Sequence, residues 1–322
     1  MADPNLGQTV TQAWEHIVKS KPEDVIFEDY WFLYKLRQGG GIKTVDGGRK
    51  LDIPLEYAAN SSVSFISEMD PLSTTRVDVF DTAEFQWKMI AGTVVQSELE
   101  DAINQGSGGK FDLLAAKLQN LKSSTESVMN ASLFSDGTGT SAKEFGGLQA
   151  LVPATATSGT VGGINRATYS WWRNKTAAGT QSAAAYDNLR AAMRSVYNQC
   201  SNGVAGDHPK FAVTTRTVFE GFEGLLLANE RFTSKESGEG AFKNEVLKFK
   251  GCEIAYDEDC LAAALYFLNP KYIKLMVQKG RWMKMFDEVE PANQLVRIFK
   301  NVTIGNLIVT NPRMLGIVHT IS

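Results

Sequence analysis

The sequence predicts an α+β fold, and three observations support this class. Apolar residues alternate with polar ones in parts of residues 49–95, which is typical of strands. Apolar residues then recur at spacings of three and four in residues 110–134, which indicates one long amphipathic helix. From residue 247 onward, short β-rich segments are separated by turn residues. Helices and a strand alternate as a compact α/β unit before residue 247 and strands dominate after it, so the overall class is α+β.

Residues 1–48 are predicted to form an N-terminal arm. Its apolar part includes Tyr30, Trp31, Phe32 and Tyr34, and a glycine-rich segment, QGGGIKTVDGGRK, follows. So many neighbouring aromatic side chains require a covering surface. Two interpretations remain open: the arm lies on a neighbouring chain, or it forms a helix docked on its own core.

Residues 49–95 are predicted to form a long β-hairpin. Its strands are KLDIPLEY and FQWKMIAGTV, and Phe85, Trp87 and Met89 share one side of the second strand. The connection between the strands, ANSSVSFISEMDPLSTTRVDVF, is polar and offers little to bury. We therefore expect the hairpin to project from the body and to contact other molecules.

Helices are predicted next. Ser97 begins the short helix SELEDAINQG, which has acidic residues in its first turn. The long helix covers residues 110–134, and its apolar stripe consists of Phe111, Leu114, Leu118, Leu121, Thr125 and Val128. A third helix, SAAAYDNLRAAMRSVYNQC, directs Leu189, Met193 and Val196 toward a core.

The remaining elements are mostly strands. KFAVTT predicts a short buried strand, and VFEGFEGLLLANERF predicts the helix after it. The strands that follow are LKFKGCEIAYD, ALYFLN, KYIKLMVQKG, RWMKMFDEVE, QLVRIFKNVTIGNLIVT and MLGIVHTI.

Composition restricts the function. The 322 residues include 33 Lys and Arg against 36 Asp and Glu, a net charge of −3, so we expect no sequence-specific DNA binding. The sequence shows neither a secretory signal nor a membrane span, so the predicted location is the cytosol without a membrane partner. Three cysteines without a CxxC pair fit reduced, buried thiols.

Motifs for catalysis are weak. GSGGKFD, residues 106–112, lacks the spacing of a phosphate loop, and GTVGGIN lacks that of a dinucleotide site. Three separated histidines, His16, His208 and His319, do not form a zinc motif. Acidic neighbours make Cys260 a poor nucleophile. Asp257, Glu258 and Asp259 could attract a divalent cation, although a solvated turn is the favoured interpretation. The sequence therefore predicts no enzyme, cofactor or bound metal.

One resemblance accounts for these elements. NASLFSDGTGT, EFGGLQALV and GTVGGINRATYSWWRN, together with the order of elements, resemble the major capsid proteins of tailed bacteriophages with the Hong Kong 97-type fold. The resemblance covers essentially the whole chain. It implies an arm at 1–48, an extended loop at 49–95, a peripheral domain at 96–179 plus 291–322 with spine helix 110–134, and an axial domain at 180–290.

The resemblance also implies structural roles for individual residues. Gly159, Gly162 and Gly163 would permit tight turns, and Trp171 and Trp172 would fill gaps between elements of the peripheral domain. Arg166 and Arg173 would pair with carboxylates within or between subunits. Trp87 and Lys50 are further interface candidates. Some relatives cross-link a loop lysine to an asparagine, but no motif identifies a partner for Lys50, so cross-linking is not predicted.

The implied function is a coat protein that assembles into pentamers and hexamers around double-stranded DNA, without sequence-specific binding. A portal protein and a separate scaffolding protein are the expected partners. The shell would assemble in the host bacterial cytoplasm, and the protein would then be part of the virion. Two alternatives are an encapsulin-like cargo shell and a soluble α+β enzyme. A neighbouring cargo gene would indicate the first, and a small oligomer with a polar pocket the second.

Overall fold

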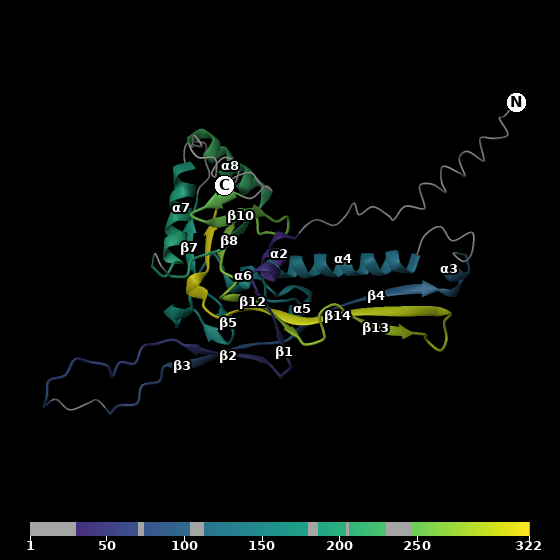
Figure 1. Cartoon of the computed structure of the whole chain (residues 1–322), viewed down its shortest axis with the longest axis horizontal. Coiled ribbons are helices and arrows are strands. Elements are labelled where there is room, and N and C mark those ends of the chain that lie inside the picture. The colour runs from purple at the N-terminus through teal and green to yellow at the C-terminus, as the bar shows by residue number, and fades with distance from the viewer. Residues whose placement is uncertain are drawn as a thin grey trace.

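Helices and strands both contribute large parts of the structure, in agreement with the predicted class. The structure, a computed structural model, describes residues 30–69, 74–103, 113–179, 186–203, 206–229 and 247–321. Within these ranges the chain forms a six-stranded sheet, a five-stranded sheet and a projecting two-stranded hairpin (Figure 1). Residues 1–29 of the predicted arm lie outside the described ranges.

The six-stranded sheet has helices on one face and the main core on the other. Its β8 strand is buried at every position because Ala212 contributes to the cluster with the helices, whereas Phe211 and Val213 contribute to the main core. One of these helices is α7, and its predicted inward residues, Leu189, Met193 and Val196, are buried. In sheet order, the strands are β7 (Lys175–Ala178), β15 (Gly316–His319), β11 (Leu265–Leu268), β8 (Phe211–Thr214), β10 (Cys252–Tyr256) and β9 (Leu247–Phe249), and the helices are α7 (Tyr186–Gln199) and α8 (Arg216–Asn229).

The five-stranded sheet is built around one long strand. This central strand pairs with three others, and residues 296–305 of it lie antiparallel to residues 88–97. Its members are β1 (Ile42–Val45), β12 (Ile273–Gln278), β14 (Val296–Val309), β13 (Lys284–Val289) and β4 (Lys88–Ser97).

The long helix, α4 (Leu113–Phe134), packs along β4 (Figure 1). Gly92 permits this approach, since a Cβ atom at Gly92 would lie 2.6 Å from Cδ1 of Leu121. The buried stripe of α4 runs through Leu121, Thr125 and Met129. The predicted stripe position Val128 is wrong, because its side chain is 57% exposed. Val128 and Met129, three and four residues after Thr125, both fit a helical period, but only Met129 faces the core.

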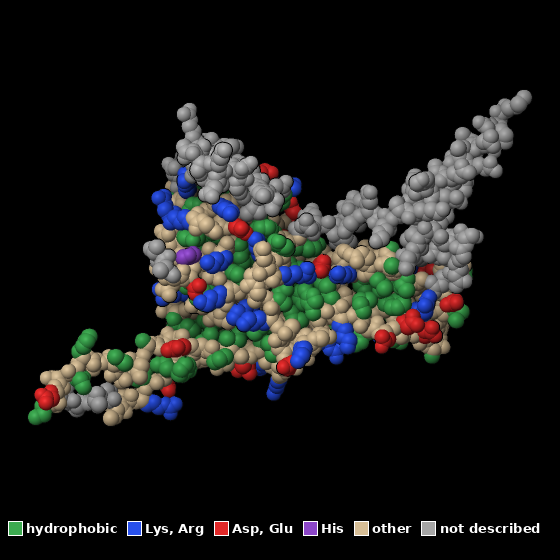
Figure 2. All heavy atoms as spheres, in the orientation of Figure 1, with side chains coloured by type: hydrophobic (Ala, Val, Ile, Leu, Met, Phe, Trp, Pro, Cys, Tyr) green, Lys and Arg blue, Asp and Glu red, His purple; other side chains and the backbone are tan. Residues whose placement is uncertain are grey.

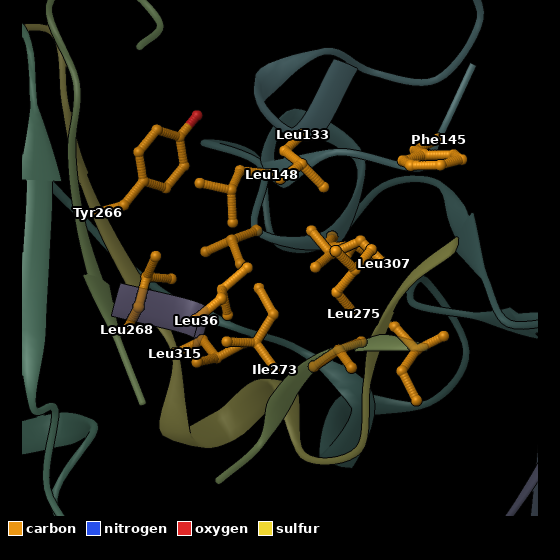
Figure 3. Packing of buried hydrophobic residues seen from close by; sticks show 14 of the residues in the cluster. Leu36, Leu133, Phe145, Leu148, Tyr266, Leu268, Ile273, Leu275, Leu307 and Leu315 are labelled. Carbon is orange, nitrogen blue, oxygen red and sulfur yellow. The ribbon is translucent and has the colours of Figure 1, made fainter. Parts of the chain in front are cut away.

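The main core joins the two sheets (Figure 3). Leu36, Leu133, Tyr266, Ile273 and Leu307 converge there from five different elements. Leu36 belongs to α2 (Trp31–Gln38), whose Phe32 and Leu33 are also buried. For these residues the interpretation of a helix docked on its own core is therefore confirmed. The short helices α5 (Gly139–Ala142) and α6 (Leu148–Leu151) and the 3-10 turns η2 (Ser170–Trp172) and η3 (Pro312–Met314) complete this body.

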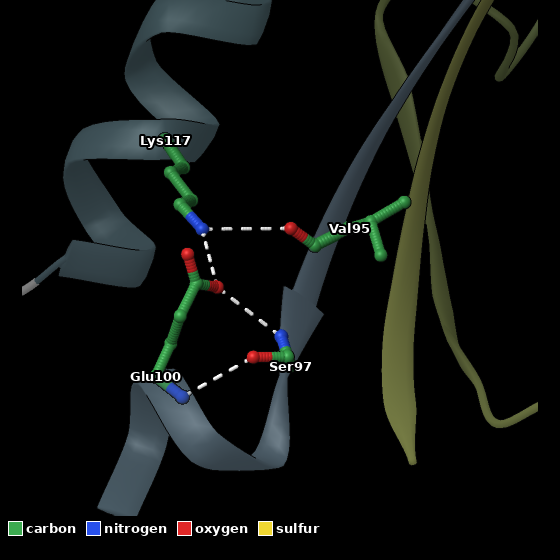
Figure 4. Close-up of polar contacts among 4 residues, drawn as sticks. All are labelled: Val95, Ser97, Glu100 and Lys117. Atoms are coloured by element: carbon green, nitrogen blue, oxygen red, sulfur yellow. Dashed lines mark hydrogen bonds and ion pairs between the residues drawn. The ribbon is translucent and has the colours of Figure 1, made fainter. Parts of the chain in front are cut away.

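The predicted short helix forms as α3 (Glu98–Ile103) at the far end of the long sheet. Ser97 Oγ accepts the Glu100 N–H at 3.2 Å, and Glu100 Oε2 accepts the Ser97 N–H at 3.2 Å, which makes a capping box (Figure 4). Lys117 of α4 donates to Glu100 Oε2 at 2.7 Å. A network of polar contacts therefore ties α3 to the long helix.

The hairpin consists of β2 (Leu51–Glu56) and β3 (Phe80–Phe85), and it extends away from the body (Figure 1). The projection agrees with the prediction, but the predicted extent does not. Residues 88–95 belong to β4 and pair with β14 instead of with β2. Phe85 and Met89 fit one continuous alternation, so the pattern alone cannot show where one strand ends and the next begins.

Strand pairing also differs from the predicted domain boundaries. β12 and β13 fall within the predicted axial domain at 180–290, yet both belong to the sheet that carries α4. β15 falls within the predicted peripheral segment 291–322, yet it pairs with β11 and β7 of the six-stranded sheet. Contiguous sequence is a poor guide here because the chain leaves the six-stranded sheet after β11 and returns to it at β15.

Candidate functional site

The base of the projecting hairpin is held by residues 159–174, which we call the hairpin-base segment. It contains the short strands β5 (Thr160–Val161) and β6 (Ile164–Asn165), joined by Gly162 and Gly163 with φ angles of 59° and 80°. Such left-handed angles favour glycine, and Gly159 also has a positive φ of 86°. The predicted tight turn at these glycines is confirmed.

Gly162 also contacts the hairpin directly. Its carbonyl accepts the Glu84 N–H at 2.9 Å, and a Cβ atom at Gly162 would lie 3.0 Å from that of Ala83. A side chain at this position would therefore push β3 away from the segment. The same glycine serves both the turn and the attachment of the hairpin.

The two tryptophans fill the space behind this turn. Trp172 is 1% exposed and donates from Nε1 to the carbonyl of Val161 at 3.0 Å. Trp171 stacks on Tyr57, which directly follows β2, with ring centroids 5.2 Å apart. Tyr57 in turn donates to the carbonyl of Asp78 on the returning chain. The tryptophans therefore connect the core with both arms of the hairpin.

The arginines of the segment bind backbone carbonyls. Arg166 is fully buried and donates to the carbonyls of Ala150, at 3.1 Å, and of Leu151. Arg173 donates to the carbonyls of Arg166 and Ala167 at 2.6 and 2.7 Å. Within the described chain, the predicted carboxylate partners are therefore wrong. Burial lowers the pKa of Arg166 to about 10, so the side chain remains charged at neutral pH.

The other two candidates lie where the hairpin meets the body. Trp87 donates from Nε1 to the carbonyl of Gly48 at 2.9 Å. Lys50 forms an exposed ion pair with Glu84 on the neighbouring strand. Both residues therefore connect the two chain segments at the base of the hairpin, which the hairpin-base segment also supports.

A polar contact that the sequence pattern did not predict lies at Asp257. We expected a solvated turn at Asp257, but its side chain is only 3% exposed. It accepts hydrogen bonds from the Phe32 N–H of α2 and from Asn130 of α4. A polar residue on the stripe side of α4 was the available signal, because a buried asparagine requires a partner.

The described residues include histidine, cysteine and acidic side chains that were candidates for chemistry. They contain no group of three or more histidine, cysteine or acidic side chains that could hold a metal ion. Cys200, Cys252 and Cys260 are buried, and burial raises the pKa of each thiol, that of Cys200 to about 12. His16 and the segment 106–112 lie outside the described ranges.

No helix in the described ranges has the length and apolar character needed to cross a membrane. A surface hollow near α3 is lined by Glu98, by Arg297 of β14 and by the turn that joins β13 to β14. It has no histidine or cysteine among its lining residues.

The outer part of the hairpin exposes large apolar side chains. Val63, Phe65, Ile66 and Met69 are between 52% and 107% exposed. Figure 2 shows hydrophobic side chains along this projection, far from the rest of the body. Exposed apolar groups on a projecting element are typical of a surface that contacts another protein.

A projecting hairpin, a long helix on a long sheet and a second sheet with its own helices define the class of Hong Kong 97-type capsid proteins. The SU10 major capsid protein family model matches residues 89–318. The chain belongs to this family, and it is a phage major capsid protein, as the sequence predicted.

Solved structures show the same fold. The chain is similar to a protein in the capsid of cyanophage A-1(L), with a TM-score of 0.71 and 15% identity over 93% of this chain and 95% of that one. A capsid protein of a native GTA particle has a TM-score of 0.64 and 14% identity over all of both chains. The SrpI encapsulin of Synechococcus elongatus has a TM-score of 0.60 and 9% identity over 94% and 91%. A comparison with curated protein sequences finds no match.

Proposed function

We propose that this capsid protein assembles as pentamers and hexamers into an icosahedral head shell around the double-stranded DNA of a tailed phage. The observation that carries the proposal is the hairpin, which combines a well-fixed base with an apolar outer part. A closed shell requires contacts between different surfaces of neighbouring copies, repeated around rotation axes. A projecting element provides such contacts.

The exposed residues are the strongest argument for a partner protein. Phe65 and Met69 are 107% and 94% exposed, and a monomer gains nothing by exposing them. Each would remove apolar area from water on contact with a neighbouring subunit. At about 25 cal/mol per Å² such burial contributes favourably at each of many repeated contacts.

The two sheets fit the two domains implied by the fold, with revised boundaries. We assign the five-stranded sheet and α4 to the peripheral domain, and the six-stranded sheet with α7 and α8 to the axial domain. The arm then includes α2, and the extended loop ends near residue 87. Residues 159–174 belong to the peripheral side, where they support the loop.

Further partners follow from the proposed role. A portal protein and a separate scaffolding protein would act during assembly in the host bacterial cytoplasm, and the chain would remain in the virion. A net charge of −3 is compatible with DNA held without sequence-specific contacts, since affinity for phosphates scales with basic contacts. We assign no catalytic activity or cofactor to the chain.

A variant of the outer hairpin tests the proposal. The change Phe65→Ser with Met69→Ser removes exposed apolar area, so we expect native circular dichroism but at least a tenfold rise in the protein concentration at which particles form, corresponding to about 1.4 kcal/mol. Sedimentation velocity would measure particle formation. Ser64→Ala, in the same loop, is the matched control. Particle formation by the double variant at the control's concentration would contradict a role for the hairpin in assembly.

A cargo shell is a second candidate, favoured by the similarity to the SrpI encapsulin fold. The contents of purified particles distinguish the two functions. Nuclease-resistant double-stranded DNA in particles made during infection supports the phage head. Particles that contain a second protein in place of DNA support the cargo shell.

A further inference from the structure

A buried carboxylate away from the hairpin has no part in the contacts proposed above. We propose that Asp257, Asp259 and Asn130 form a proton-controlled junction that sets how firmly α2 and α4 are held against the six-stranded sheet. We call this cluster the Asp257 junction. It concerns the subunit itself and holds whether the shell contains DNA or another cargo.

Three elements meet at the junction. Asp257 directly follows β10, and its Oδ2 accepts the Phe32 N–H in the first turn of α2 at 3.3 Å. Its Oδ1 accepts from Asn130 Nδ2 of α4 at 3.0 Å and from the Asp259 N–H at 3.2 Å. Asn130 Nδ2 also donates to Asp259 Oδ2 at 2.8 Å. One amide group therefore connects two carboxylates on the same turn.

Among the residues that the structure describes, no side-chain cation forms an ion pair with Asp257 or Asp259. On α2, Lys35 pairs with Glu253 and Arg37 pairs with Glu126 of α4. On the turn itself, Glu258 pairs with Arg216. The nearby Cys260 thiol and Tyr266 phenol are buried, and burial raises the pKa of both, so they are neutral. Backbone and amide N–H groups, with the positive end of α2, therefore stabilise the carboxylate.

This environment favours a bound proton. Burial raises the pKa of Asp257 to about 6, and the charge of Asp259 acts in the same direction, against the hydrogen bonds that lower it. Asn130 also has a fully buried Oδ1 without a partner among the described residues. Little water reaches this amide oxygen, which agrees with burial as the main cause of the raised pKa of Asp257.

The direction of the effect follows from linkage. An acid whose pKa is higher in the docked state than the ordinary 3.8 binds its proton more tightly there, so docking is strongest at low pH. It weakens as the pH rises from about 3.8 to about 6. Between pH 5 and pH 7 a single site of this kind changes the docking equilibrium about tenfold. At neutral pH, α2 should therefore undock more readily than at pH 5.

Hydrogen exchange of the full chain tests the junction. After correction for intrinsic exchange rates, the amide groups of α2 should be protected about tenfold more at pH 5 than at pH 7. Asp257→Asn keeps an acceptor for the Phe32 N–H but cannot titrate, so the tenfold difference should disappear. Glu258→Gln, on the same turn but exposed and paired with Arg216, should retain it.

A second variant keeps the test decisive if Asp257→Asn does not fold. Asn130→Leu removes a donor to Asp257, so the midpoint of the change in protection should move to higher pH. The inference is overturned if Asp257→Asn retains the full pH dependence, or if the midpoint in Asn130→Leu is unchanged. Equal protection of wild-type α2 at pH 5 and pH 7 would overturn it as well.

Discussion

Arg166 shows at the scale of one residue what sequence can and cannot predict. The segment around it was correctly expected to be structural, because its glycines and tryptophans suit tight turns and packing better than phosphate binding. Within the described chain, Arg166 donates to two backbone carbonyls where a carboxylate partner was expected. Every residue has a carbonyl, so no sequence pattern identifies such a partner. Asp257 illustrates the converse, because its acidic neighbours suggested exposure while the fold buries it.

We predict that Arg166→Gln lowers the free energy of unfolding by about 2–3 kcal/mol, because the buried carbonyls of Ala150 and Leu151 lose donors. Arg76→Gln is the control, since Arg76 is 90% exposed and its pair with Asp78 contributes at most about 1 kcal/mol. Denaturant unfolding of unassembled subunits measures both. Equal stability of the two variants would show that the buried hydrogen bonds contribute little.

At the scale of elements, local signals predicted most helices and strands. Ser97 and the acidic residues after it identified α3, and the apolar spacing identified α4 and α7. The pairing of strands was less predictable. β4 has an alternation that continues that of the hairpin, but its partner is β14, some 200 residues later in the chain. β12 and β15 also pair with strands that the predicted boundaries placed in the other domain, β12 with β14 and β15 with β11.

The packing of α4 on β4 gives a prediction at this scale. Gly92→Val places atoms where Leu121 lies, so we expect a loss of about 1–3 kcal/mol and a shift of α4. Ala91→Val introduces the same side chain on the opposite, exposed face of β4 and should change stability by less than about 0.5 kcal/mol. Thermal unfolding compares them. A Gly92→Val variant as stable as Ala91→Val would refute the close packing described here.

At the scale of the whole molecule, the shape explains the function better than any single residue does. The hairpin extends in one direction and the long sheet in the other, which leaves opposite ends free to meet different neighbours (Figure 1). The resemblance seen in sequence covered the whole chain, and the family match and the fold confirm it. The contacts between subunits could not be predicted, because they depend on surfaces of a second copy.

The most direct test of the central claim is the size of the purified protein. Light scattering and negative-stain electron microscopy should be applied to the full chain, expressed alone and together with its genomic neighbours. A shell-forming subunit should yield closed or aberrant shells, or free pentamers and hexamers, in at least one of the two conditions. A discrete monomer or dimer in both, without tubes, sheets or shells, would contradict the assignment.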